Sequence, residues 1–217
     1  MNRLITVIWL IILGAVFTML SAPESREVFR QLTLAYPYTM GFLKIGILGA
    51  MGELLGGRIV TGGWRLTSIR LHQRMLVWGF LGWLFTAVFP LFSFGVDGLL
   101  DVGLIPGAGS TLAAAFWKSF FMNLIFAFPM MVFHRVTDSL IERGELFSAW
   151  PLVEVYTNID WRNMFRIVGA ACIRFWIPAH TFTFLLPVEF RVVCAALLAV
   201  VLGAILGFAK KRAQSRV

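Results

Sequence analysis

The stretch R-N-M-F-R-I-V-G-A-A-C-I-R-F-W-I-P-A-H-T-F-T-F-L-L-P-V-E-F-R, residues 162–191, decides the fold of this chain. It is mostly apolar and is long enough to cross a bilayer. Arg162, Arg166 and Arg174 recur at four and then eight residues, so on a helix they form one column. An arginine in hydrocarbon costs about 3 kcal/mol on insertion scales unless it faces protein, water or a partner. The spacing therefore predicts that the column faces the interior of a helix bundle.

The composition of the whole chain agrees with a membrane protein. Apolar residues make up 59% of the 217 residues and charged residues only 14%, whereas a soluble domain carries about 25% charge. We predict an all-α, polytopic transmembrane helix bundle with about five to six membrane helices and short interfacial helices. The net charge is +8. In a membrane protein this indicates basic loops that contact the anionic lipid headgroups of the bilayer, so the lipid and not nucleic acid is the expected partner.

Apolar runs divide the chain into candidate spans. Outside the opening stretch they cover residues 4–20, 36–55, 75–96, 112–133 and 190–208. We expect an extra N-terminal anchor helix over residues 1–26, the transmembrane bundle over 27–209 and a basic tail over 210–217. Residues 134–150 are charged and amphipathic, which predicts a solvated helix. Whether residues 162–209 form two spans or one broken element stays open.

The distribution of basic residues predicts the topology. With six spans, twelve lysines and arginines fall on one side of the membrane and three on the other. Because basic loops stay on the cytoplasmic side, both termini are expected on the cytoplasmic or matrix-like side.

Glycines mark the expected helix contacts. Gly46, Gly49 and Gly52 repeat at intervals of three, and Gly49 lies four residues before Glu53. Gly169 lies near the arginine column. Small residues let helix backbones approach closely in membranes, so these glycines are predicted packing positions.

Ionisable residues at membrane depth are the candidate functional groups, because they are costly there and usually functional. The set is Lys44, Glu53, Lys118, Arg166, Arg174 and His180. Four cations face one acid, which predicts a hydrated cationic cavity with Asn123 among its polar groups. Lys44 and Glu53, nine residues apart, should lie on opposite helix faces and not pair. The alternative is that these groups bond backbone carbonyls or extend to the membrane surfaces.

Motifs for catalysis or cofactor binding are missing from the sequence. There is no H-E-x-x-H or C-x-x-C pattern, and the three histidines lack ligand spacing. Cys172 and Cys194 both lie in apolar runs, where a cysteine is usually a small buried side chain. We therefore expect no metal, no cofactor and no enzymatic activity. Ser110 and Asp160 are expected to cap helices.

Three segments resemble the Mpv-seventeen family of mitochondrial and peroxisomal membrane proteins. Y-P-Y-T-M-G-F-L-K-I-G-I-L-G-A-M-G-E-L-L-G looks like that family's P-x-x-T followed by a glycine-rich helix ending in Gly-Asp. K-S-F-F-M-N-L-I-F-A-F-P resembles its Lys, Asp-Gln, Pro pattern, with Asn123 and Leu124 replacing Asp and Gln. W-I-P-A-H-T-F-T-F-L-L-P-V-E-F-R is similar to its W-P-x-x-Q-x-x-N-F-x-x-V-P-x-x-x-R signature, and Trp176, Pro187 and Arg191 match.

The resemblance implies a membrane pore for small solutes, and the charge count suggests that it favours anions, with Lys118, Arg166 and Arg174 as selecting cations and Glu53 as their counter-charge. The alternative is a non-catalytic structural or assembly subunit of a larger membrane complex, with other membrane subunits or a second copy as partner. The resemblance favours the mitochondrial inner membrane. A bacterial inner membrane and a peroxisome are the other locations considered.

Overall fold

The computed structural model of the chain describes residues 2–64, 66 and 69–214, and this part is helical with turns and no strand. Six helical elements in it are long and apolar enough to cross a membrane, which confirms the predicted all-α helix bundle. They are Asn2–Ser21, Pro37–Thr61, Leu71–Asp101, Thr111–Arg143, Trp161–Leu185 and Val188–Arg212.

The helices group into two compact units. Unit 1 contains the chain up to Trp83 and again from Val192 onward, and unit 2 is Leu84–Arg191. Helices α4 (Leu71–Asp101) and α10 (Val188–Gln214) each contribute to both units. The first 26 residues, expected as a separate anchor, group with unit 1.

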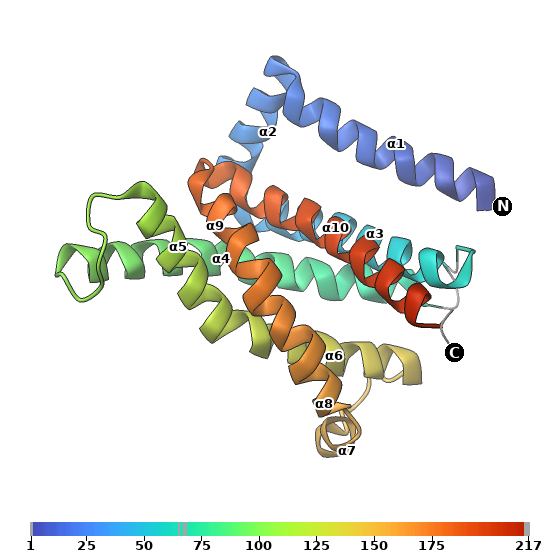
Figure 1. Cartoon of the computed structure of the whole chain (residues 1–217). Coiled ribbons are helices and arrows are strands. Elements are labelled where there is room, and N and C mark those ends of the chain that lie inside the picture. Colours follow the sequence, from blue (N-terminus) through green and yellow to red (C-terminus); the bar gives the residue numbers. More distant parts are fainter. Residues whose placement is uncertain (1, 65, 67–68, 215–217) are drawn as a thin grey trace. The chain divides into compact units, whose positions relative to one another are not determined.

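Unit 1 begins with α1 (Asn2–Ser21), α2 (Pro23–Ala35) and α3 (Pro37–Thr61), which follow one another in Figure 1. Proline at the first position of α2 and of α3 suits a helix start, since that position needs no donor. The indole nitrogen of Trp9 donates to the carbonyl of Met51, 3.2 Å away, and this bond ties α1 to α3.

Glycines bring the helices of unit 1 close together. A methyl group placed on Gly46 would lie 3.1 Å from the carbonyl oxygen of Met75 in α4, and one on Gly52 would lie 2.8 Å from that of Ala199 in α10. A methyl group on Gly49 would lie 2.6 Å from the nearest atom of the Trp78 ring in α4. The three glycines therefore serve two different neighbours of α3.

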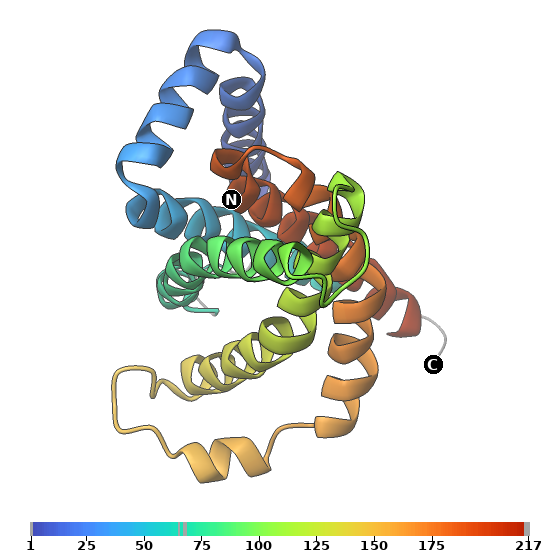
Figure 2. The ribbon, with the colours of Figure 1, turned by 90° about the vertical axis from the view of Figure 1, so that its left-hand side faces the viewer.

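Unit 2 contains the rest of α4 and two long helical elements. The first joins α5 (Thr111–Met122), a π-helical segment (Asn123–Ala127) and α6 (Phe128–Arg143). The second joins α8 (Trp161–Asn163), π-helical segments Met164–Gly169 and Cys172–Trp176, and α9 (Ile177–Leu185). Helices α5 and α9 lie side by side. Figure 2 shows α7 (Leu152–Thr157) between the loops that join α6 to α8.

The predicted caps are present in unit 2. The Ser110 side chain accepts a hydrogen bond from the Ala113 amide at 3.2 Å, and Asp160 Oδ1 accepts from the Asn163 amide at 3.0 Å. Helix α9 ends at Leu185 and α10 begins at Val188, so residues 162–209 form two elements.

Two boundary predictions are wrong. The expected third span, residues 75–96, runs from Leu71 to Asp101, so Asp97 lies in a helix and not in a loop. The solvated helix expected over residues 134–150 ends at Arg143 and buries His134. The third span is longer because polar residues at its ends remain helical, and one of them, Asp97, pairs with Lys118. Helix α6 ends early because Gly144 adopts the left-handed conformation (φ 84°) that terminates helices. Residues 65, 67 and 68 of the expected basic loop lie outside the described residues.

Candidate functional site

The arginine column does not line the interior. Arg162, Arg166 and Arg174 are all exposed, so the prediction that they face inward is wrong. The buried positions of their element include Met164, Cys172 and His180, which are spaced by eight, and also Thr183 and Phe184 near its end. Arg166 and Arg174 follow the first two of these by two residues, which on a helix is the opposite side. The face of this element that carries Met164 and Cys172 is therefore buried, and the arginine side chains lie on its exposed face.

The buried cation of unit 1 is held by side chains around it. Lys44 is 7% exposed; its Nζ donates to Thr33 Oγ1 at 2.7 Å and lies 4.4 Å from the centre of the Phe29 ring. A hydroxyl oxygen and an aromatic face both favour a positive charge. Lys44 thus has its own stabilising contacts and does not pair with Glu53.

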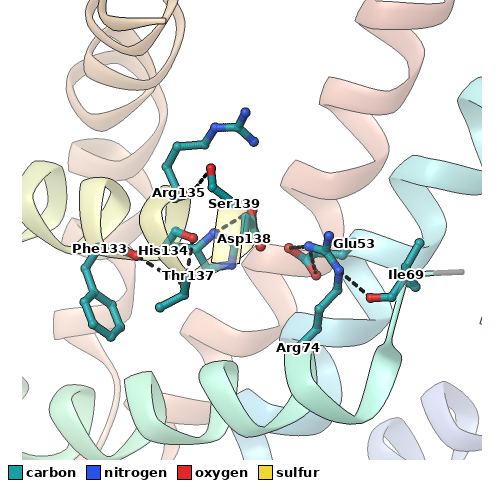
Figure 3. A network of polar contacts seen from close by, with 9 residues as sticks. All are labelled: Glu53, Ile69, Arg74, Phe133, His134, Arg135, Thr137, Asp138 and Ser139. Atoms are coloured by element: carbon teal, nitrogen blue, oxygen red, sulfur yellow. Dashed lines mark hydrogen bonds and ion pairs between the residues drawn. The ribbon is translucent and has the colours of Figure 1, made fainter. Parts of the chain in front are cut away.

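Glu53 pairs with Arg74, which lies in the first turn of α4. Arg74 Nη1 lies 3.3 Å from each carboxylate oxygen of Glu53, and Arg74 Nε donates to the Ile69 carbonyl at 2.9 Å. Figure 3 shows the guanidinium between these two groups. Because Arg74 balances Glu53, this carboxylate is not available as the counter-charge of a cationic pore.

Lys118 in unit 2 is likewise neutralised. Its Nζ lies 2.8 Å from Asp97 Oδ1 and 2.9 Å from Oδ2. The apolar run of the third span ends at residue 96, so the sequence does not place Asp97 among the predicted charges at membrane depth. The signal was present, since Asp97 continues the helical register of an uninterrupted apolar run.

Asn123 and His180 meet in the buried interior of unit 2. Asn123 is 2% exposed and His180 is 3% exposed. Asn123 Nδ2 lies 2.8 Å from the Ser119 carbonyl oxygen and 3.2 Å from His180 Nδ1. The Ser119 hydroxyl donates to the Ile177 carbonyl at 2.7 Å, which joins α5 to α9. Trp176 stacks on the imidazole with ring centres 4.8 Å apart.

These contacts fix the hydrogen positions. The carbonyl of Ser119 can only accept, so the Asn123 atom beside it is the amide nitrogen. That nitrogen also donates to His180 Nδ1, so in the neutral ring the hydrogen is on Nε2. His180 Nε2 and Asn123 Oδ1 are fully buried and have no hydrogen-bond partner within the described residues. The pair therefore offers one unused donor and one unused acceptor.

A third polar pair lies further along the same helical element. His134 Nδ1 is 3.2 Å from Asp138 Oδ2, one turn later on α6. The Thr137 hydroxyl, also buried, donates to the carbonyl of His134 at 2.8 Å. Figure 3 shows these three side chains together on α6, and Ser139 donating to the Arg135 carbonyl.

Five polar residues follow one another along the Thr111–Arg143 candidate span. We call Lys118, Ser119, Asn123, His134 and Asp138 the polar row. Lys118 and Asp138 are twenty residues apart, which is about 30 Å along a helix and equals the thickness of the hydrocarbon layer. The Lys118–Asp97 ion pair and the His134–Asp138 contact thus lie near the two ends of the polar row, and Asn123 with His180 lies between them.

Gly169, predicted as a packing position, does not lie close to the backbone of a neighbouring helix. A methyl group on Gly169 would lie 3.7 Å from the Phe128 ring, an ordinary contact. Arg191, expected outside the membrane, donates to Ser93 Oγ at 3.0 Å and to the carbonyls of Leu186 and Phe184.

No known protein family, curated protein or solved structure matches this chain. The resemblance described above therefore stays a prediction. The six apolar helices and the buried polar pairs define the class of protein: this chain is an integral, multi-pass helical membrane protein.

Proposed function

We propose that unit 2 forms a pathway for small uncharged polar solutes across the membrane. The observation that carries the proposal is the Asn123–His180 pair, which is buried between the ends of the polar row with an unused donor and acceptor. Unsatisfied polar groups are costly inside proteins and are usually retained for a function.

The chemistry of the pair suggests the class of solute. His180 Nε2–H donates and Asn123 Oδ1 accepts, so a hydroxyl or amide compound with both kinds of group complements them. Asn123 begins one π-helical segment, and another ends four residues before His180; such segments are frequent at functional sites.

The proposed pathway has no preference for anions, in contrast to the expectation from the sequence. That expectation rested on Lys118, Arg166 and Arg174. Lys118 is balanced by Asp97 and the two arginines face outward. With no uncompensated cation among these residues at the polar row, nothing in it favours an anion over a neutral solute.

The test is solute flux into liposomes. Vesicles that contain the purified protein are expected to swell in urea or glycerol faster than empty vesicles. Asn123→Leu, of similar size, should abolish this excess flux, and His180→Phe should do the same. Thr181→Val is the matched control, because the Thr181 hydroxyl bonds its own helix at Ile177. The proposal fails if wild-type vesicles swell like empty ones, or if both variants conduct like the wild type.

The second candidate is a non-catalytic subunit of a larger membrane complex. The observation that favours it is Arg174, which is exposed in the middle of a candidate span. A mild-detergent extract of the native membrane separates the candidates, since a subunit migrates with a partner and a self-sufficient pathway does not need one.

The membrane that contains the chain is a further part of the proposal. The resemblance favours the mitochondrial inner membrane over a bacterial inner membrane or a peroxisome. Fractionation of the source cells, with antibody detection of the chain, tests this assignment directly.

A further inference from the structure

We propose that Arg174 is the docking point for a transmembrane helix of another protein that carries a carboxylate near its midpoint. The inference concerns the outward face of the Trp161–Leu185 element and does not depend on whether unit 2 conducts solutes.

The depth of Arg174 is the first argument. It lies thirteen residues after Trp161 and eleven before Leu185, at the midpoint of the element. The distance from the bilayer centre to the headgroups is about 15 Å, which is longer than an arginine side chain. Arg174 therefore cannot reach the headgroups without distorting the bilayer, and an unpaired guanidinium there costs several kcal/mol.

Arg166 provides an internal comparison. It is exposed on the same side but lies only five residues from Trp161, about 8 Å along the helix. Its side chain can extend to the membrane surface, where Trp161 suits the interface. The two arginines are thus chemically alike and differ in depth.

The chain does not supply the missing charge itself. Within the described part of the chain, Arg174 has neither a hydrogen bond nor an ion pair. Three carboxylates within the candidate spans already have cationic or histidine partners: Glu53 with Arg74, Asp97 with Lys118 and Asp138 with His134. A second copy of this chain would have to break one of these pairs, so we infer a different protein.

The surroundings of Arg174 favour a helix over a soluble partner. Ile173 is 63% exposed and Phe182 is 57% exposed on the same element. An apolar surface around a single charge excludes water, and a carboxylate–guanidinium pair is strong where water is excluded. Charge complementarity at the bilayer midpoint therefore defines the partner: an apolar helix with one central Asp or Glu.

A designed peptide tests the proposal without knowledge of the partner. The probe is a leucine-alanine transmembrane peptide with one central aspartate, labelled for energy transfer to the purified full-length protein in phosphatidylcholine vesicles at pH 8. Its matched controls have asparagine at the centre or aspartate at one end. We expect the central-aspartate peptide to bind about tenfold or more tightly than either control.

Variants assign the effect to one residue. Arg174→Gln should remove the preference for central aspartate, Arg174→Lys should retain most of it, and Arg166→Gln should leave it unchanged. Equal binding of all three peptides by the wild type would overturn the proposal, as would an unaltered preference in Arg174→Gln. Two further results would also overturn it: Arg174-dependent self-association of the protein, which would make a second copy the occupant, and loss of the aspartate preference when anionic lipid is added, which would make a lipid phosphate the partner.

Discussion

Gly52→Ala tests the close packing of α3 and α10 in unit 1. The new methyl carbon would lie 2.8 Å from the Ala199 carbonyl oxygen and 3.1 Å from the Val200 Cα. Both are backbone atoms, so the helices must separate. Overpacking of this kind costs about 1–3 kcal/mol. Helix propensity alone predicts the reverse, since alanine is favoured over glycine by about 0.8–1.0 kcal/mol in a helix.

Gly57→Ala is the matched control on the same helix. No atom lies within 4 Å of a methyl group at Gly57, so only the gain in helix propensity remains. The difference in unfolding free energy between the two variants is therefore the packing term alone. For a chain of this size, 1 kcal/mol corresponds to roughly 2–4 °C in Tm, so we expect Gly52→Ala to unfold several degrees below Gly57→Ala.

Thiol labelling measures the difference in unfolding temperature between the two variants in unit 1. In a Cys172→Ala background, Cys194 is the remaining cysteine and lies in α10. A maleimide dye that fluoresces on reaction then follows its exposure in detergent as the temperature rises. A Gly52→Ala protein as stable as Gly57→Ala would refute the packing argument, because it would mean that the helices move apart at no cost.

Three other variants test individual contacts. Lys44→Met should keep or raise the thermal stability, whereas Thr33→Val should lower it by about 1–3 kcal/mol, because it leaves a buried ammonium without its hydroxyl; Tm values of the two variants check this. A double-mutant cycle of Glu53→Gln and Arg74→Gln should give a coupling energy of about 1 kcal/mol or more, and additive effects would contradict the pairing. Ser110→Ala should cost about 1 kcal/mol through loss of the α5 cap, measured by the same unfolding assay.

Much of the fold follows from the sequence because apolar runs and helix signals are local. The length of each run sets the number of spans, and Pro187 separates α9 from α10 where a proline is expected to end a helix. Caps at Ser110 and Asp160 also depend on neighbouring residues only. Such features need no knowledge of tertiary contacts.

The site was harder to predict because it depends on which face of a helix packs inward. The spacing of Arg162, Arg166 and Arg174 established that they share a column, but the spacing is the same for an inward and an outward column. The π-helical segments Met164–Gly169 and Cys172–Trp176 also change the number of residues per turn, which the spacing argument did not include. Only the exposure of the three arginine side chains in the folded chain shows that the column faces outward.

The sequence also does not predict which residues pair with the buried polar and charged side chains. Lys118 and Asn123 were identified from the sequence as polar residues at membrane depth, but Asp97 and Ser119 were not assigned to them. Serine is common in membrane helices, so Ser119 carried no special signal. The four-residue spacing of Ser119 and Asn123 on one helix face was the available clue.

The central claim is that solutes cross the membrane through unit 2, past Asn123 and His180. Inhibition of solute flux by Ag⁺ tests this claim most directly. Ser119 is fully buried beside Asn123, so Ser119→Cys in a background without Cys172 and Cys194 places one thiol next to the Asn123–His180 pair. If solutes pass there, Ag⁺ should stop urea flux through this variant and leave the cysteine-free parent, or a Thr181→Cys variant, unaffected. Flux through the Ser119→Cys protein that continues at full rate in Ag⁺ would contradict a pathway through unit 2.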